Sequence, residues 1–141
     1  MNLVDQLLKA DVKKADELEK GVFKSKRLAK ILGKDEGETV DVEIREIKSR
    51  RLNEIVSSQF TGKGNLNYSK TYDAKVKVII EGVVDPNLRD KSLQEYFGVS
   101  DAASLAEKLF GNEITDLSDA ISTLSGISSD DDEDQEDEIK N

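Results

Sequence analysis

Carboxylates are the only abundant side chains in this sequence that could do acid–base chemistry. The chain of 141 residues has no cysteine and no histidine, but it has 30 Asp and Glu residues. Thiolate nucleophiles, imidazole bases and the usual transition-metal ligands are therefore missing. A hydrolase can work with a pair of carboxylates, yet helix capping or solvation explains each candidate, namely Asp73, Glu81, Asp85, Asp90 and Glu95. We predict a protein that is not an enzyme and needs no cofactor or metal.

The acidic residues are concentrated at the C-terminal end. Residues 129–141 contain eight Asp and Glu and one Lys, so they carry −7 of the total net charge of −9. An EF-hand calcium loop needs a glycine inside its run of acidic ligands, and none follows here. Too few apolar side chains are present to offset the cost of ordering this segment. We expect a disordered acidic tail that aids solubility or weakly contacts a basic surface.

Basic residues form two clusters in the first half of the chain, Lys24, Lys26, Arg27 and Lys30, and then Arg45, Lys48, Arg50 and Arg51. On a hairpin followed by a helix these clusters could share one face, as in nucleic-acid-binding proteins. Against that role, Phe23 is the only aromatic residue beside them, and the chain as a whole is acidic. We interpret the clusters as a solvated face for a protein partner or another copy of the chain. Nucleic-acid binding through this face is the alternative.

The elements that must position these residues follow from the spacing of apolar side chains. Residues 1–20 are predicted to form an N-terminal helix, because one stripe contains Leu3, Val4, Leu7 and Leu8. Residues 21–47 predict a β-hairpin with two glycines in its connector. The first arm of this hairpin also fits helical spacing, through Leu28, Ile31 and Leu32.

Residues 48–127 predict a compact bundle of about five short helices. Ser49 is predicted to cap a helix to about Phe60, and a polar loop separates it from residues 72–84. That segment fits both a strand and a helix, but its length and the following Asp85-Pro86 favour a helix. Three short helices follow, with the caps Asp90, Ser100 or Asp101, and Asn112. The predicted fold is α+β and predominantly helical, with one domain over 1–128.

Apolar residues of these short helices could also leave a groove open for a partner's helix. Most of them are expected to form the core. The residues with which we associate partner binding are Leu93, Tyr96, Phe97 and Phe110, together with Lys24, Lys26, Arg27, Arg50 and Arg51.

The segment from Val83 to Gly126 resembles a known family. The order is an apolar helix, then DPNL, DKSLQEYFGV and LAEKLFGNEITDLSDAI, which is similar to the XkdN-like tail assembly chaperones of long-tailed phages and prophages. The resemblance implies that the protein binds the tape measure protein, keeps it soluble and helps to recruit tail tube subunits. It also implies absence from the mature virion and, in many members, a longer product made by frameshifting. A structural subunit of the tail or neck is the other phage-related alternative.

No apolar run approaches the ~20 residues of a membrane span, and the first residues lack the pattern of a signal peptide. We therefore expect a soluble protein that stays in the cytoplasm of the bacterial host. Self-association is a further expectation, since the two halves of the chain differ in the sign of their charge.

Overall fold

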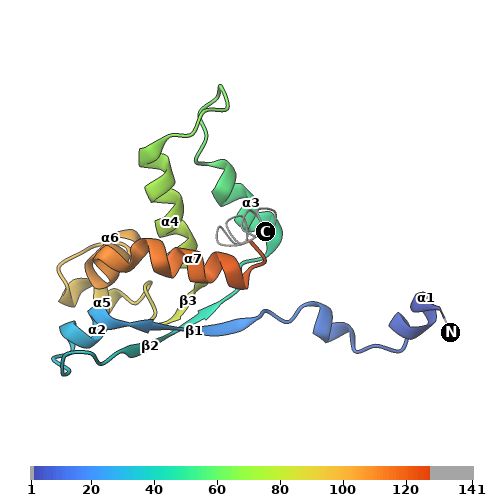
Figure 1. Ribbon diagram of the computed structural model, residues 1–141, viewed down its shortest axis with the longest axis horizontal. Coiled ribbons are helices and arrows are strands. Elements are labelled where there is room, and N and C mark those ends of the chain that lie inside the picture. Colours follow the sequence, from blue (N-terminus) through green and yellow to red (C-terminus); the bar gives the residue numbers. More distant parts are fainter. Residues whose placement is uncertain (1, 128–141) are drawn as a thin grey trace, which may run out of the picture.

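Three antiparallel strands form a small sheet in the order β1-β2-β3. The computed structural model describes residues 2–127, and Figure 1 shows helices α6 (Ala102–Phe110) and α7 (Ile114–Leu124) above one face of this sheet. Burial alternates along β2 (Val40–Arg45): Val42 and Ile44 are buried, whereas the residues between them are exposed. One face of the sheet therefore carries the core and the other faces solvent. The predicted α+β class is confirmed.

Strand β1 (Lys20–Ser25) pairs with β2 in the register Lys20↔Arg45 to Ser25↔Val40. The predicted antiparallel pairing is therefore confirmed, but the two strands are not joined by a simple turn. Helix α2 (Lys26–Ile31) stands between them, with Leu28 and Ala29 buried. The second half of the first arm therefore forms a helix, as its apolar spacing also allowed. The hairpin interpretation is wrong for that half.

The third strand, β3 (Val83–Asp85), was not predicted. It follows directly on helix α4 (Tyr68–Gly82), and its residues pair with Glu43 and Ile44 of β2. A strand of three residues has no readable periodicity of its own, and only its pairing with β2 defines it. The helix expected over residues 72–84 is confirmed, although it begins earlier, where Asn67 caps it through the backbone N–H of Lys70 at 3.1 Å.

The N-terminal segment is less helical than predicted. It contains the short helix α1 (Leu3–Leu7) and the single 3₁₀ turn η1 (Val12–Ala15), and neither has a buried residue. The apolar stripe at the start of the chain is correctly placed on α1, but within residues 2–127 no other element buries its side chains. Without such packing a helix cannot extend far, because short isolated helices are marginal in water.

The remaining helices are α3 (Ser49–Ser57), α5 (Lys91–Tyr96) and the 3₁₀ turn η2 (Gly111–Glu113). Two predicted caps are confirmed, since Asp90 accepts a hydrogen bond from the N–H of Leu93 at 2.9 Å and Asp101 from that of Ser104 at 2.7 Å. The largest fully buried side chains are Phe110, Leu52, Ile55, Ile79, Leu105, Leu117 and Ile121. The predicted acidic tail, 129–141, lies outside the described residues.

The predicted cap Ser49 is wrong, because α3 begins at Ser49 itself and its cap position, Lys48, makes no side-chain capping bond. The predicted cap Asn112 is also wrong. It lies inside η2, and α7 begins at Ile114 after Glu113, whose side chain makes no capping bond to its own helix. The carboxylate of Glu113 instead reaches the N-terminus of α2. It accepts hydrogen bonds from the Ser25 hydroxyl at 2.5 Å and from the Lys26 N–H at 3.0 Å. A residue near the end of the chain therefore completes the cap of a helix near its beginning.

Gly82 allows α4 to approach α7 closely. A Cβ atom at this position would lie 2.5 Å from Cγ2 of Ile121, which is well inside van der Waals contact. Both residues are buried. The absence of a side chain at Gly82 therefore sets the distance between the two helices that form much of the core.

Candidate partner-binding surface

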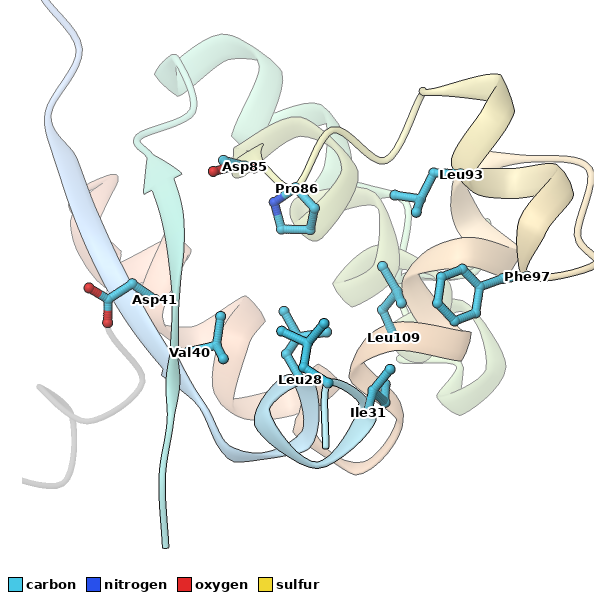
Figure 2. A pocket seen from close by; sticks show the side chains of 10 residues that line it. Leu28, Ile31, Val40, Asp41, Asp85, Pro86, Leu93, Phe97 and Leu109 are labelled. Carbon is cyan, nitrogen blue, oxygen red and sulfur yellow. The ribbon is translucent and has the colours of Figure 1, made fainter. Parts of the chain in front are cut away.

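An apolar pocket of about 240 Å³ opens between the sheet and the short helices at one end of the molecule. Figure 2 shows side chains from α2, β2, α5 and α6 converging on it, together with the turn after β3. Its lining residues are Leu28, Ile31, Leu32, Val40, Asp41, Asp85, Pro86, Leu93, Phe97 and Leu109. Eight of these ten residues are apolar, so the pocket suits an aliphatic or aromatic side chain.

Local sequence explains why these side chains meet. Leu28, Ile31 and Leu32 are spaced at i, i+3 and i+4, so they share one face of the turns that Ser25 begins. On the opposite side, Pro86 stands immediately after β3 and follows a cis peptide bond from Asp85. The pocket therefore depends on the packing of segments that lie far apart in the sequence.

The exposed part of the pocket's rim is apolar. Ile31 is 40% exposed and Leu32 is 63% exposed. The charged lining residues are Asp41 and Asp85, and the Asp41 carboxylate forms an exposed ion pair with the Lys24 ammonium at 2.6 Å. Such a pair adds little stability. Figure 2 shows the Asp41 side chain directed away from the pocket, so its carboxylate does not offer a site for a partner's cation there.

The structure divides the four apolar residues that we associated with partner binding. Leu93 and Phe97 line the pocket and are half-buried. Tyr96 is 85% exposed, and its ring meets that of Phe97 edge to face, with centroids 5.4 Å apart. Phe110 is 0% exposed. It belongs to the core because α6 turns it inward, and it presents no surface to a partner in this structure.

Among the basic residues of the first cluster, Lys26 is exposed and Lys24 pairs with Asp41. Arg27 has a different position. Its guanidinium donates to the carbonyl of Lys108 at 2.9 Å, and a Cβ on Gly111 would lie 2.5 Å from its Cζ. Its Nε is buried and, in the described part of the chain, makes no hydrogen bond. Arg27 therefore ties α2 to the end of α6.

The second basic cluster lies on and beside α3. Arg50 is exposed, whereas Arg51 forms ion pairs with Glu81 at 3.0 Å and Glu54 at 3.3 Å. Its hydrogen bond to Glu81, followed by that to Glu54, raises the pKa of Arg51 above its usual value. Figure 1 shows α2 and α3 on opposite sides of the folded body. The two clusters therefore do not form the single basic face that the sequence allowed.

Sequence reasoning missed several residues of the pocket, chiefly Ile31, Leu32, Val40 and Pro86. The signal for the first two was present, because Ser25 is a good N-cap and a helical stripe follows it. Val40 and Pro86 carry no local signal. The pairing of β1 with β2 sets Val40 opposite Ser25 at the start of α2, and Pro86 follows β3, which pairs with β2.

The described residues 2–127 contain no group of three or more acidic side chains arranged to hold a metal ion. Within the same range, no helix has the length and apolar character needed to cross a membrane.

Known proteins resemble this chain in sequence and in fold. The model of the phage XkdN-like tail assembly chaperone family matches residues 4–140. No curated protein matches. A crystal structure of the protein yqbn superimposes with a TM-score of 0.54 and 18% sequence identity, over 79% of this chain and 90% of that one. The structural likeness supports the fold, and the family match covers nearly all of the chain. The protein belongs to the XkdN-like tail assembly chaperones of phages.

Proposed function

We propose that this chain is a non-enzymatic assembly factor that binds the tape measure protein in the host cytoplasm. By covering apolar segments of that protein it keeps it soluble, promotes assembly of the tail tube around it, and is absent from the mature virion. Membership of the tail assembly chaperone family implies protein partners in the phage tail. The tape measure protein, as the particular partner, is our proposal.

The observation that carries the proposal is the apolar pocket with its exposed rim. A chaperone for a long helical client must offer an apolar surface while its own core stays closed. The pocket satisfies both conditions, because Leu32 and Ile31 at the rim are exposed while Leu109 at its base is buried. A client helix could place one or two aliphatic side chains between Leu93 and Phe97.

The test is co-expression with the tape measure protein of the same phage. The wild-type chain should keep that protein in the soluble fraction and co-purify with it. Leu32→Glu places a charge on the rim and should abolish both effects, because burying an unpaired carboxylate against an apolar client is costly. Leu66→Glu is the matched control, since Leu66 is 51% exposed and lies on the loop between α3 and α4, away from the pocket.

Both variants change an exposed residue, so both should fold, which circular dichroism can check. If the wild-type chain neither solubilises nor retains the tape measure protein, the proposed function is wrong. If the wild type binds and both variants bind equally well, the function stands and the pocket is not the binding site. Purified particles provide a separate check, because a virion subunit would be present in them and a chaperone would not.

A further inference from the structure

Positive charge gathers at the end of the sheet from which β2 leads into α3. Lys20 of β1 and Arg45 of β2 are register partners, and both are exposed. Like charges directly opposite each other destabilise a sheet. Lys48 comes three residues after Arg45, at the cap position of α3, and it is also exposed. We call Lys20, Arg45 and Lys48 the basic end surface.

A hollow of about 240 Å³ lies within this surface. Its lining residues are Leu18, Arg45, Glu46, Ile47, Lys48, Arg51 and Glu81. Both of its carboxylates already have donors, because Glu46 accepts a hydrogen bond from the Glu19 N–H at 2.7 Å and Glu81 pairs with Arg51 at 3.0 Å. Within residues 2–127, Arg45 and Lys48 take part in no ion pair. The hollow therefore offers two uncompensated cations to an anionic ligand.

The described part of the chain ends beside this surface. The Ser125 hydroxyl accepts a hydrogen bond from the N–H of Ile47 at 2.8 Å and donates one to the carbonyl of Ile121 at 2.7 Å. Figure 1 shows the end of α7 close to the start of α3. Two residues further, the Ile127 N–H donates to the Ser122 carbonyl at 2.8 Å. These bonds hold the point from which the acidic residues follow near Ile47, the residue before Lys48.

We propose that the acidic segment 129–141 docks on the basic end surface of its own chain and masks that surface from other polyanions. The charges are complementary, because the segment carries −7. Its first acid, Asp130, comes three residues after Ile127, and three residues span at most about 10 Å. Such a short tether gives an effective concentration on the order of millimolar. A second copy would have to compete with that concentration, so the segment of the same chain is the occupant.

A spin label on the full-length chain tests the docking. Because the sequence contains no cysteine, Gln135→Cys places a single nitroxide inside the acidic segment without changing its charge. The amide NMR signals of Arg45 and Lys48 should fall to less than half of their intensity with the label reduced. Those of Lys30 and Lys34 serve as the control, since these exposed basic residues belong to α2 and the loop after it, on the opposite side of the body from α3 (Figure 1).

Charge reversal and salt identify the interaction. Arg45→Glu/Lys48→Glu should abolish the broadening, whereas Lys30→Glu/Lys34→Glu changes the net charge by the same −4 and should leave it intact. At 1 M salt, where the Debye length is about 3 Å, the broadening should disappear. Equal broadening at the control residues, or broadening that survives the Arg45→Glu/Lys48→Glu change or the salt, would overturn the proposal.

Mixing two forms of the protein separates docking within a chain from docking between copies. A ¹⁵N-labelled chain without the spin label is mixed with an unlabelled chain that carries it. Docking within one chain predicts no broadening in this mixture. Broadening of Arg45 and Lys48 in the mixture, to the extent seen within the labelled chain, would show that a second copy supplies the segment, and the proposal would be wrong.

Retention on heparin tests the masking. One variant removes the charge of five acids, through Asp130→Asn, Asp131→Asn, Asp132→Asn, Glu133→Gln and Asp134→Asn. It should need more salt for elution than the wild type, because polyanion binding by basic residues is salt-dependent. Adding Arg45→Glu/Lys48→Glu should cancel more of this increase than adding Lys30→Glu/Lys34→Glu. Equal effects of the two pairs would mean that net charge alone governs retention, and the masking would be refuted. Neither measurement involves the tape measure protein, so neither bears on the proposed function.

Discussion

Glu113→Ala should destabilise the protein much more than its position at a helix start suggests. Its carboxylate accepts hydrogen bonds from the Ser25 hydroxyl at 2.5 Å, the Lys26 N–H at 3.0 Å and the Arg27 N–H at 3.4 Å. All three donors belong to the first turn of α2 or its cap. The substitution leaves this helix start without its tertiary acceptor, while α7, in which Glu113 makes no capping bond, should be little affected.

The size of the expected loss in stability depends on which of these donors can bond to water once the carboxylate is removed. Ser25 is 0% exposed, so its hydroxyl hydrogen loses its partner at a cost of about 1–3 kcal/mol. The Lys26 N–H lies at the surface, so losing its bond costs about 1 kcal/mol, as for an ordinary N-cap. The 3.4 Å contact to Arg27 is too long to add much. The expected loss for Glu113→Ala is therefore about 2–4 kcal/mol in the free energy of unfolding.

Equilibrium unfolding in urea, followed by circular dichroism at neutral pH, measures this loss. With a slope of about 2 kcal/mol per molar urea, in the middle of the usual range, the midpoint should fall by about 1–2 M. Glu113→Gln keeps one acceptor oxygen, but its NH2 group replaces the second oxygen, so it should lose about 1–2 kcal/mol with the bond from one donor and the charge at the helix start. The double variant with Ser25→Ala should lose less than the sum of the single variants. A loss below about 0.5 kcal/mol for Glu113→Ala, the range of ordinary surface changes, would refute the reasoning.

Three further changes test other contacts by the same urea assay. Gly82→Ala should lower the free energy of unfolding by about 1–3 kcal/mol, because its new methyl group overpacks against Ile121. When Ile121→Ala is added in the same chain, the two losses should be less than additive. Additive losses would argue against the clash. Leu105→Ala should cost about 2–5 kcal/mol, because its side chain is 0% exposed; a loss below 1 kcal/mol would contradict this. The N–H of Ser104 lowers the pKa of Asp101, so the stability that this charge contributes is present above about pH 4 and lost as pH falls through the lowered pKa. Asp101→Asn keeps the cap without the charge, so its deficit should be present at neutral pH and vanish in strong acid; a deficit that does not change with pH would refute this.

The local elements of the fold were largely readable from the sequence. Asp90 and Asp101 cap the helices where expected, and the helix before Pro86 is where the proline stop indicated. Each of these features depends on side chains within four residues of one another. Such contacts form whatever the rest of the chain does, so a sequence pattern is enough to locate them.

The candidate site was only partly readable, because its residues come from distant segments. Leu93 and Phe97 were expected to meet a partner and do line the pocket, whereas Phe110 is in the core. All three are apolar residues on short helices, and their spacing alone does not show which face of a helix is covered. Arg27 was grouped with its basic neighbours, but the close approach of Gly111 makes it a link between two helices.

The sequence by itself determined which reactive side chains are absent, the class of the fold and the family. The chain contains no cysteine and no histidine, and composition alone settles which side chains are present. Tertiary structure decided the third strand, the cap of α2 by Glu113 and the pocket with its exposed rim. The reason is that each of these joins positions tens of residues apart, whose approach depends on how the helices and the sheet pack together. The same packing leaves the stripe on the N-terminal segment uncovered, although its apolar spacing was plain in the sequence.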